Sequence, residues 1–182
     1  IGISRSDPDK SHNHQKLGIE KDIIKKKGDI CDNKKISKFI ERYQPDEIYN
    51  FAAQSSVSKS FNKIEETIKG IVNGTINLLE TSRRIGFKGR IFFAGSSEIF
   101  GNTDTAADRN HPHNPMNPYA ISKQTSFNLV KLYRENYNIN CVTGILFNHE
   151  SYLREDSFVT QKIIHSAKKI MKKGAKKIKL GN

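Results

Sequence analysis

The sequence contains no tryptophan, two cysteines and five prolines in 182 residues, and it has no long apolar run. Cys31 and Cys141 lie far apart and lack metal-ligand spacing, so we expect buried free thiols, no disulfide framework and no bound metal. A membrane-spanning helix needs about 20 apolar residues, and no stretch approaches that length. The N-terminal residues also lack the basic-then-apolar order of a secretory signal. We therefore expect a cytoplasmic globular protein with no membrane partner.

Acidic residues are scarce relative to basic ones. The sequence has 19 Asp and Glu residues and 31 Lys and Arg residues, which gives a net charge of +12. Such an excess is found in proteins that bind nucleic acid or anionic membranes. Here the lysines gather beside a predicted strand at 25–27 and along 168–179, and no aromatic residues alternate with them as a base-stacking platform requires. We predict solvated basic faces, no nucleic-acid partner and a negatively charged small ligand. A polyanion-binding module that uses the C-terminal lysines is the alternative.

Apolar runs alternate with helical patterns along the whole chain, which is typical of parallel strands joined by crossover helices. Asp32 is a predicted N-cap, and its helix should end before Pro45. We expect strands near 1–3, 23–30, 47–51, 89–94, 141–147 and 177–180, with 89–94 fully buried. Besides the helix after Asp32, we expect one long helix over 64–85 and helices over 119–137 and 158–173, with Gly86 and Gly174 as C-terminal caps.

Ligands of open α/β sheets bind beyond the carboxyl ends of the strands. Four segments with small or polar residues follow predicted strands, and these are 29–30, 52–55, 95–98 and 148–151. Because the carboxyl ends of parallel strands share one edge of a sheet, we expect a single cleft to collect all four segments.

Tyr119 and Lys123 are four residues apart at the start of a predicted helix, which puts both side chains on one helix face. A nearby ammonium stabilises a phenolate, so Tyr119 is a candidate general base. Ser96 and Glu98 add a hydroxyl and a carboxylate after a neighbouring strand. Alone, each residue has an ordinary structural explanation, such as a turn, a helix cap or a solvated side chain. Their joint position at strand ends favours an acid–base site.

Several of these motifs resemble the extended short-chain dehydrogenase/reductase superfamily, namely Tyr119-x-x-x-Lys123, Asp29-Ile30 and the segment Asn-Phe-Ala-Ala-Gln-Ser at 50–55. The string Gly-Ile-Leu-Phe-Asn-His-Glu-Ser at 144–151, followed by Arg154 and by 158–163, is similar to the GDP-mannose 4,6-dehydratase family. This resemblance runs from Gly2 to Asn182. It implies an α/β fold with a Rossmann-like doubly wound parallel sheet, incomplete at its N-terminus.

The resemblance also implies a division of the chain. Residues 1–147 would form part of an NADP-binding domain, and residues 148–182 would begin a substrate-binding region. The family's Gly-rich phosphate-binding turn is absent from the sequence. We therefore expect a fragment of a longer protein, without that turn and without the family's C-terminal region, and a homo-oligomer when the protein is full length.

The activity implied by the resemblance is the conversion of GDP-mannose to GDP-4-keto-6-deoxymannose, a loss of water with internal hydride transfer through NADP. In that scheme Tyr119, held as a phenolate by Lys123, removes the hydroxyl proton at carbon 4 of the hexose, and Ser96 hydrogen-bonds the same oxygen. Glu98 takes the proton from carbon 5 as water leaves carbon 6. A simple epimerase has no second proton to move and would not need this carboxylate.

The implied cofactor contacts are spread along the chain. Arg5 would bind the 2′-phosphate of NADP, and the adenine would lie against Asp29 and Ile30. The pyrophosphate and nicotinamide ribose would contact Phe51, Ala52, Ala53, Gln54 and Ser55, with Lys123, His149 and Arg154 completing the shell. Asn148 and Lys162 would contact the substrate.

The sequence departs from the family pattern at several positions. Ser96 replaces the family's threonine and keeps a hydroxyl, Ser6 follows Arg5 where the family has a second arginine, and Glu66 replaces a tyrosine. Other functions therefore remain possible from the sequence. The chain could belong to another nucleotide-sugar epimerase, dehydratase or decarboxylase of the same superfamily, or it could be an inactive fragment or the polyanion-binding module.

Overall fold

The structure is a computed structural model that describes residues 1–6 and 12–173. It divides into two compact units, Ile1–Phe147 (unit 1) and Asn148–Asn182 (unit 2). The predicted cap Gly174 and the strand expected at 177–180 lie outside the described residues. Within the described ranges, no helix combines the length and the apolar character needed to cross a membrane.

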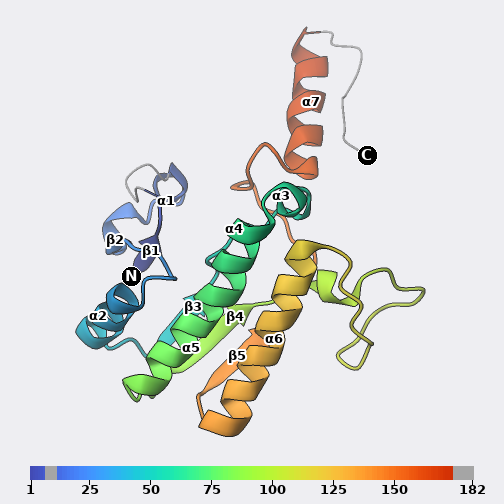
Figure 1. Cartoon of the computed structure of the whole chain (residues 1–182). Coiled ribbons are helices and arrows are strands. Elements are labelled where there is room, and N and C mark those ends of the chain that lie inside the picture. The colour runs from blue at the N-terminus through green and yellow to red at the C-terminus, as the bar shows by residue number, and fades with distance from the viewer. Residues whose placement is uncertain (7–11, 174–182) are drawn as a thin grey trace. The chain divides into compact units, whose positions relative to one another are not determined.

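The strands of unit 1 are all parallel, as the sequence predicts. β1 (Gly2–Ser4) pairs with β2 (Lys25–Lys27), while β3 (Glu47–Asn50), β4 (Arg90–Ala94) and β5 (Cys141–Gly144) form a second sheet in that order (Figure 1). No ladder joins β1 or β2 to β3 in the described part of the chain.

Helices connect the strands and cover one face of the second sheet. The α-helices of unit 1 are α1 (His12–Lys16), α2 (Asn33–Tyr43), α3 (Val57–Asn62), α4 (Ile64–Ile68), α5 (Gly74–Arg84) and α6 (Pro118–Tyr137), and single 3₁₀ turns form η2 (Glu20–Asp22) and η4 (Ser97–Phe100). Asp32 caps α2 as predicted, since its Oδ1 accepts from the backbone N–H of Lys35 at 3.0 Å. In Figure 1, α5 and α6 lie side by side along β3, β4 and β5.

The helix expected over 64–85 is not regular throughout. A π-helical segment, η3 (Lys69–Asn73), separates α4 from α5. Its carbonyl groups have partners outside the normal helical ladder, because the Ile71 oxygen accepts from Ser126 Oγ and Thr75 Oγ1 and the Lys69 oxygen accepts from Cys31 Sγ. These contacts compensate for the widened turn. Gly86 follows α5 with φ at +65°, which is the left-handed conformation expected of a C-terminal glycine.

The core of unit 1 lies between α5, α6 and the β3–β4–β5 sheet. Leu79 is 0% exposed and Ile91 1% exposed, and Cys141 is a fully buried free thiol. Cys31 is a free thiol that is only partly buried, so the expectation for it is wrong. The strand 89–94 is also not fully buried, because only Ile91 and Phe93 point toward the helices while Phe92 lies on the opposite, more open face.

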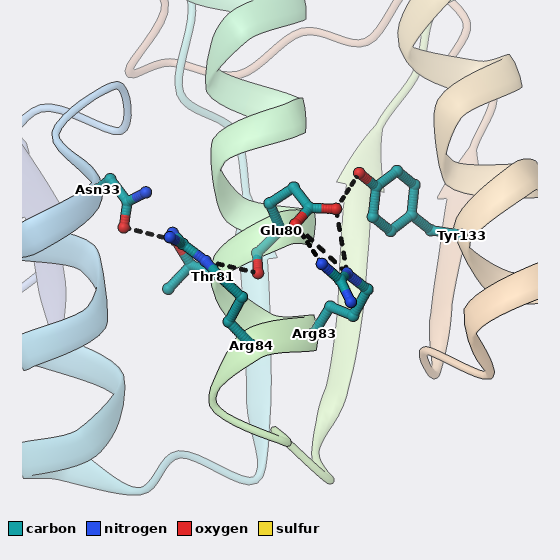
Figure 2. Close-up of polar contacts among 6 residues, drawn as sticks. All are labelled: Asn33, Glu80, Thr81, Arg83, Arg84 and Tyr133. Atoms are coloured by element: carbon teal, nitrogen blue, oxygen red, sulfur yellow. Dashed lines mark hydrogen bonds and ion pairs between the residues drawn. The ribbon is translucent and has the colours of Figure 1, made fainter.

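Polar contacts attach α5 to a helix on each side (Figure 2). Thr81 Oγ1 lies 3.4 Å from Asn33 Oδ1 of α2, and Glu80 accepts a 2.6 Å hydrogen bond from the Tyr133 hydroxyl of α6. Arg83 also pairs with Glu80, at 3.0 Å, and this pairing lowers the pKa of the Glu80 carboxyl. Burial and the bond to Glu80 raise the pKa of Tyr133 to about 12, so the phenol remains a donor.

Unit 2 contains α7 (Val159–Lys173), close to the predicted 158–173. Lys162 N–H donates to the Phe158 carbonyl at 2.9 Å and so joins the loop to the helix. Gln161 is 6% exposed and its amide donates to the Ser151 carbonyl at 3.0 Å, which folds the preceding loop back onto the first turn of α7.

We predict that Leu79→Ala lowers the free energy of unfolding by about 2–5 kcal/mol, since it removes buried methyl groups and leaves a cavity. The matched control is Leu132→Ala on α6, where the side chain is 45% exposed and the loss should stay below about 1 kcal/mol. Urea unfolding of both variants measures the difference. Equal losses would contradict the assignment of Leu79 to the core.

Candidate active site

Two of the predicted site residues lie directly after β4. Ser96 is the N-cap of η4 and is 8% exposed, and its Oγ accepts from the backbone N–H of Glu98 at 3.3 Å. The chain can pass close to β5 here because Gly95 has no side chain, and a Cβ at that position would lie 2.9 Å from the Gly144 carbonyl oxygen. Ser96 and Glu98 are thereby placed at the carboxyl end of the sheet.

Asn117 connects this turn to α6. It caps the helix by accepting from the Ala120 N–H at 2.8 Å, and its side-chain amide donates to Glu98 Oε2 at 2.9 Å. The same side chain therefore fixes the start of α6 and the carboxylate of Glu98. Asn117 was not among the candidates from sequence, although an asparagine directly before a proline at the first helical position indicates an N-cap.

Tyr119 and Lys123 share one face of α6, as their spacing predicts. The ammonium nitrogen of Lys123 lies 5.6 Å from the centre of the Tyr119 ring and donates to the Ala94 carbonyl at 2.7 Å. Tyr119 is 8% exposed. Burial lowers the pKa of Lys123 to about 8, because its charged form loses most of its hydration. With a pKa of about 8, Lys123 loses its proton at a lower pH than an exposed lysine does.

A small cavity of about 20 Å³ lies beside Lys123, at the carboxyl ends of β3, β4 and β5. Its lining includes Asn50, Ala52, Gly95 and Lys123. A much larger cavity, of about 1080 Å³, is lined by Asn50 and Ala52 as well. Of the segments expected to meet in one cleft, Asp29, Ile30, Ala52 and Ala53 line the large cavity and Gly95 lines the small one, while Ser96 and Glu98 line neither.

The large cavity contains six of the predicted cofactor contacts, namely Arg5, Asp29, Ile30, Phe51, Ala52 and Ala53. Asp29 also accepts from the Cys31 N–H at 2.9 Å, which stabilises the turn after β2. Glu66 lines the same cavity and pairs with Lys63 at 2.9 Å, and this pairing lowers the pKa of the Glu66 carboxyl. The charged side chains that line this cavity are therefore one cation, Arg5, and three carboxylates, Asp29, Glu47 and Glu66.

Gln54 and Ser55 are not among the residues that line either cavity. The Gln54 amide donates to Thr67 Oγ1 at 2.9 Å and its oxygen accepts from the Ser56 N–H at 2.8 Å, so the side chain attaches the loop after β3 to α4. The implied cofactor contacts of Gln54 and Ser55 stay predictions.

The other predicted contacts belong to unit 2. Asn148, His149 and Lys162 have exposed side chains. The guanidinium of Arg154 stacks on Phe158 at 3.7 Å from the ring centre and pairs with Glu150 at 3.7 Å. Their roles toward a cofactor or substrate stay predictions. Among the described residues, no group of three His, Cys, Asp or Glu side chains is placed to hold a metal ion.

Comparison with known protein families assigns the chain to one of them. The model of the GDP-mannose 4,6-dehydratase family matches residues 3–182. The chain belongs to the GDP-mannose 4,6-dehydratase family. It is 40% identical over 158 residues to the GDP-mannose 4,6-dehydratase of Drosophila melanogaster, which covers 85% of this chain and 40% of that protein. The chain thus spans less than half the length of this relative.

Solved structures confirm the fold. UDP-glucuronic acid 4-epimerase from Bacillus cereus superposes with a TM-score of 0.81 over 92% of this chain and 54% of that one, at 21% identity. RMD from Pseudomonas aeruginosa, complexed with NADPH, superposes with a TM-score of 0.69 over 80% of this chain and 50% of that one, at 26% identity. The Rossmann-like α/β class predicted for this family member is therefore correct.

We predict that Lys123→Met raises the free energy of unfolding at pH 7, by at most about 3 kcal/mol, because it removes a charge that folding desolvates. The folded-state pKa of Lys123 is below its unfolded value, so the cost is complete below pH 8 and is relieved as the pH rises toward 10.5. The excess stability of the variant should therefore shrink between pH 8 and pH 10. Urea unfolding at pH 7, 8.5 and 10 measures it.

The control for this prediction is Lys131→Met, which makes the same change on the exposed side of α6. It should alter stability little at any of these pH values. If the extra stability of Lys123→Met stays constant with pH, the charge of Lys123 is not what destabilises the unsubstituted protein.

Proposed function

We propose that the protein carrying this chain converts GDP-mannose to GDP-4-keto-6-deoxymannose, as a hydro-lyase with bound NADP. The single observation that carries the proposal is the contact of Asn117 with Glu98, since it holds a carboxylate beside the start of the helix that bears Tyr119 and Lys123. Oxidation at a hydroxyl needs only a base such as Tyr119. Loss of water also needs a group that removes a carbon-bound proton, and Glu98 is that group.

The roles of the four residues follow from their chemistry. Tyr119 accepts the proton of the hydroxyl at carbon 4, and the ammonium of Lys123, 5.6 Å from the ring centre, stabilises the phenolate. Ser96 Oγ donates to the same substrate oxygen. Glu98 removes the proton at carbon 5, which the adjacent ketone has acidified, and then gives that proton to the hydroxyl at carbon 6, which departs as water.

The large cavity fits a dinucleotide in its size and in its lining. Small-molecule sites commonly measure about 300–1,000 Å³, and this cavity has about 1080 Å³. The small side chains of Ala52 and Ala53 leave the backbone open to a ligand, while Asp29 and Arg5 supply an acceptor and a cation. When bound, the nicotinamide supplies the hydride acceptor and donor of the reaction.

We further propose NADP in preference to NAD, with Arg5 holding the 2′-phosphate. Arg5 lines the cavity next to the carboxyl end of β1, and the NADPH complex of RMD supports the choice. His149 and Arg154 as cofactor contacts, Asn148 and Lys162 as substrate contacts, and a homo-oligomeric whole protein are further parts of this proposal.

We predict that Glu98→Gln in the intact protein lowers the formation of the 4-keto-6-deoxy product from GDP-mannose and NADP⁺ by about 10²–10⁴-fold, because the amide cannot accept the proton from carbon 5. Absorbance of the reduced nicotinamide in a single turnover should persist, since Tyr119 and Lys123 remain. The control is Glu135→Gln on the exposed face of α6. Unchanged elimination would remove Glu98 from the mechanism, and release of a 4-epimer by the unsubstituted protein would contradict the proposed reaction.

We predict that Arg5→Ala in the intact protein weakens NADP binding by about tenfold or more and changes NAD binding by less than about threefold, because a hydrogen bond to a charged group contributes about 1.5–3 kcal/mol. Isothermal titration with each dinucleotide measures the two affinities. Arg109→Ala, an exposed arginine outside the cavity, is the control. Equal weakening for both dinucleotides would contradict a 2′-phosphate contact.

A further inference from the structure

The backbone of Glu98 is fixed from both sides within the η4 turn. Its N–H donates to Ser96 Oγ at 3.3 Å, and its carbonyl accepts from the Gly101 N–H at 3.2 Å. The two residues that follow it are buried, since Ile99 is 1% and Phe100 4% exposed. A displacement of the Glu98 backbone would therefore disturb the packing of unit 1.

The segment 113–117 packs against the same turn. The Asn114 N–H donates to the Ile99 carbonyl at 2.9 Å. The ring of His113 lies edge-on to that of Phe100, with 5.3 Å between the ring centres. The segment is thus attached to η4 through its backbone and through a side chain before it reaches the cap of α6.

Asn117, at the end of this segment, is fixed by the start of α6. It is 9% exposed, its Oδ1 accepts from the Ala120 N–H at 2.8 Å, and its carbonyl accepts from the Ile121 N–H at 2.9 Å. The side-chain nitrogen donates to Glu98 Oε2 at 2.9 Å. Because the capping bond sets the plane of the amide, its nitrogen points toward the carboxylate in one fixed direction.

The bond to Asn117 makes the two carboxylate oxygens of Glu98 different. Oε2 accepts from the Asn117 amide, whereas Oε1 accepts no hydrogen bond within the described part of the chain. A hydrogen bond to an ionised oxygen stabilises its charge and makes that oxygen a weaker proton acceptor. Oε1 is therefore the oxygen available to take a proton.

We propose that Asn117 is the positioning residue for the elimination step, because it holds Oε2 and so presents Oε1 as the one oxygen that carries the proton. This inference rests on the proposed function. The bond between carbon 5 and its hydrogen breaks, its electron pair forms the double bond between carbons 5 and 6, and the bond between carbon 6 and oxygen breaks. The proton passes from Oε1 to the departing hydroxyl, so water leaves and Glu98 is a carboxylate again.

Oxidation at carbon 4 depends on different contacts. Lys123 donates to the Ala94 carbonyl at 2.7 Å, and its ammonium lies 5.6 Å from the centre of the Tyr119 ring. Neither contact involves the side-chain amide of Asn117. Loss of the bond to Glu98 should therefore slow the release of water and leave the first hydride transfer intact. A residue that only capped α6 would not separate the two steps in this way.

The first test is Asn117→Ser in the intact protein, since serine caps a helix as well as asparagine does but has no amide nitrogen. Product formation from GDP-mannose should fall about 10–100-fold, because a small misplacement of a catalytic group has an effect of that size. The rate at which reduced nicotinamide appears in a single turnover should change by less than about threefold. Asn128→Ser, the same change on the exposed face of α6, is the control and should alter neither rate.

The second variant, Asn117→Asp, reverses the polarity of the contact. Aspartate has the shape of asparagine and is an equally good cap, but it faces Glu98 with an oxygen. Two carboxylates in contact repel, so elimination should slow at least as much as in Asn117→Ser. With GDP-mannose deuterated at carbon 5, both variants should show a larger isotope effect on product formation than the unsubstituted protein, because proton removal has become the slow step.

The contact itself is measured without turnover. In NMR spectra the side-chain amide resonance of Asn117 should move in Glu98→Gln and stay in place in Glu135→Gln, a matched change on the exposed face of α6. Unchanged elimination in both Asn117 variants, or an equal loss of oxidation and elimination in Asn117→Ser, would overturn the positioning role.

Failure of the proposed function gives a different result, because the unsubstituted protein would then form no 4-keto-6-deoxy sugar from GDP-mannose. The NMR comparison still decides in that case. An Asn117 amide resonance that does not respond to Glu98→Gln would overturn the contact on which the inference depends.

Discussion

Burial of α5 against β4 is the constraint on which the rest of unit 1 depends. Leu78 and Leu79 share one buried cluster with Ile91 and Phe93, and the polar groups of α5 reach α2 on one side and α6 on the other. The cluster also orients the ends of the strands. Asn77 of α5 also donates to the Ile30 carbonyl, so the same helix holds the turn after β2.

The candidate site adds an electrostatic cost to this core. Lys123 is held by one carbonyl at the end of β4, and burial lowers its pKa to about 8. Asn117 performs two tasks with one side chain, since its oxygen caps α6 and its nitrogen binds Glu98. The chemistry of the site therefore depends on the geometry of a helix terminus, and the packing of α5 and α6 supplies the stability that the buried charge removes.

Local signals in the sequence predict local structure well here. Asp32, Pro45 and Pro118 mark helix ends that the structure reproduces within a residue or two, and the spacing of Tyr119 and Lys123 is enough to put them on one face. What the sequence does not reveal depends on distant partners. The η3 segment is stabilised by Cys31 and Ser126, which lie far from it along the chain, and the apolar spacing of 64–85 is compatible with an ordinary α-helix. Likewise, the strand pattern predicts parallel strands but not the separation between β1 and β3, which is a property of how they pair.

The most direct test of the central claim, that Tyr119, Lys123, Ser96 and Glu98 carry out an internal oxidation, elimination and reduction, is isotope tracing in the intact protein. GDP-mannose deuterated at carbon 4 is converted and the product analysed by NMR. The account predicts deuterium at carbon 6 of a 4-keto-6-deoxy sugar. Deuterium retained at carbon 4 of an epimer, or a 4-keto-6-deoxy product without deuterium at carbon 6, would contradict it.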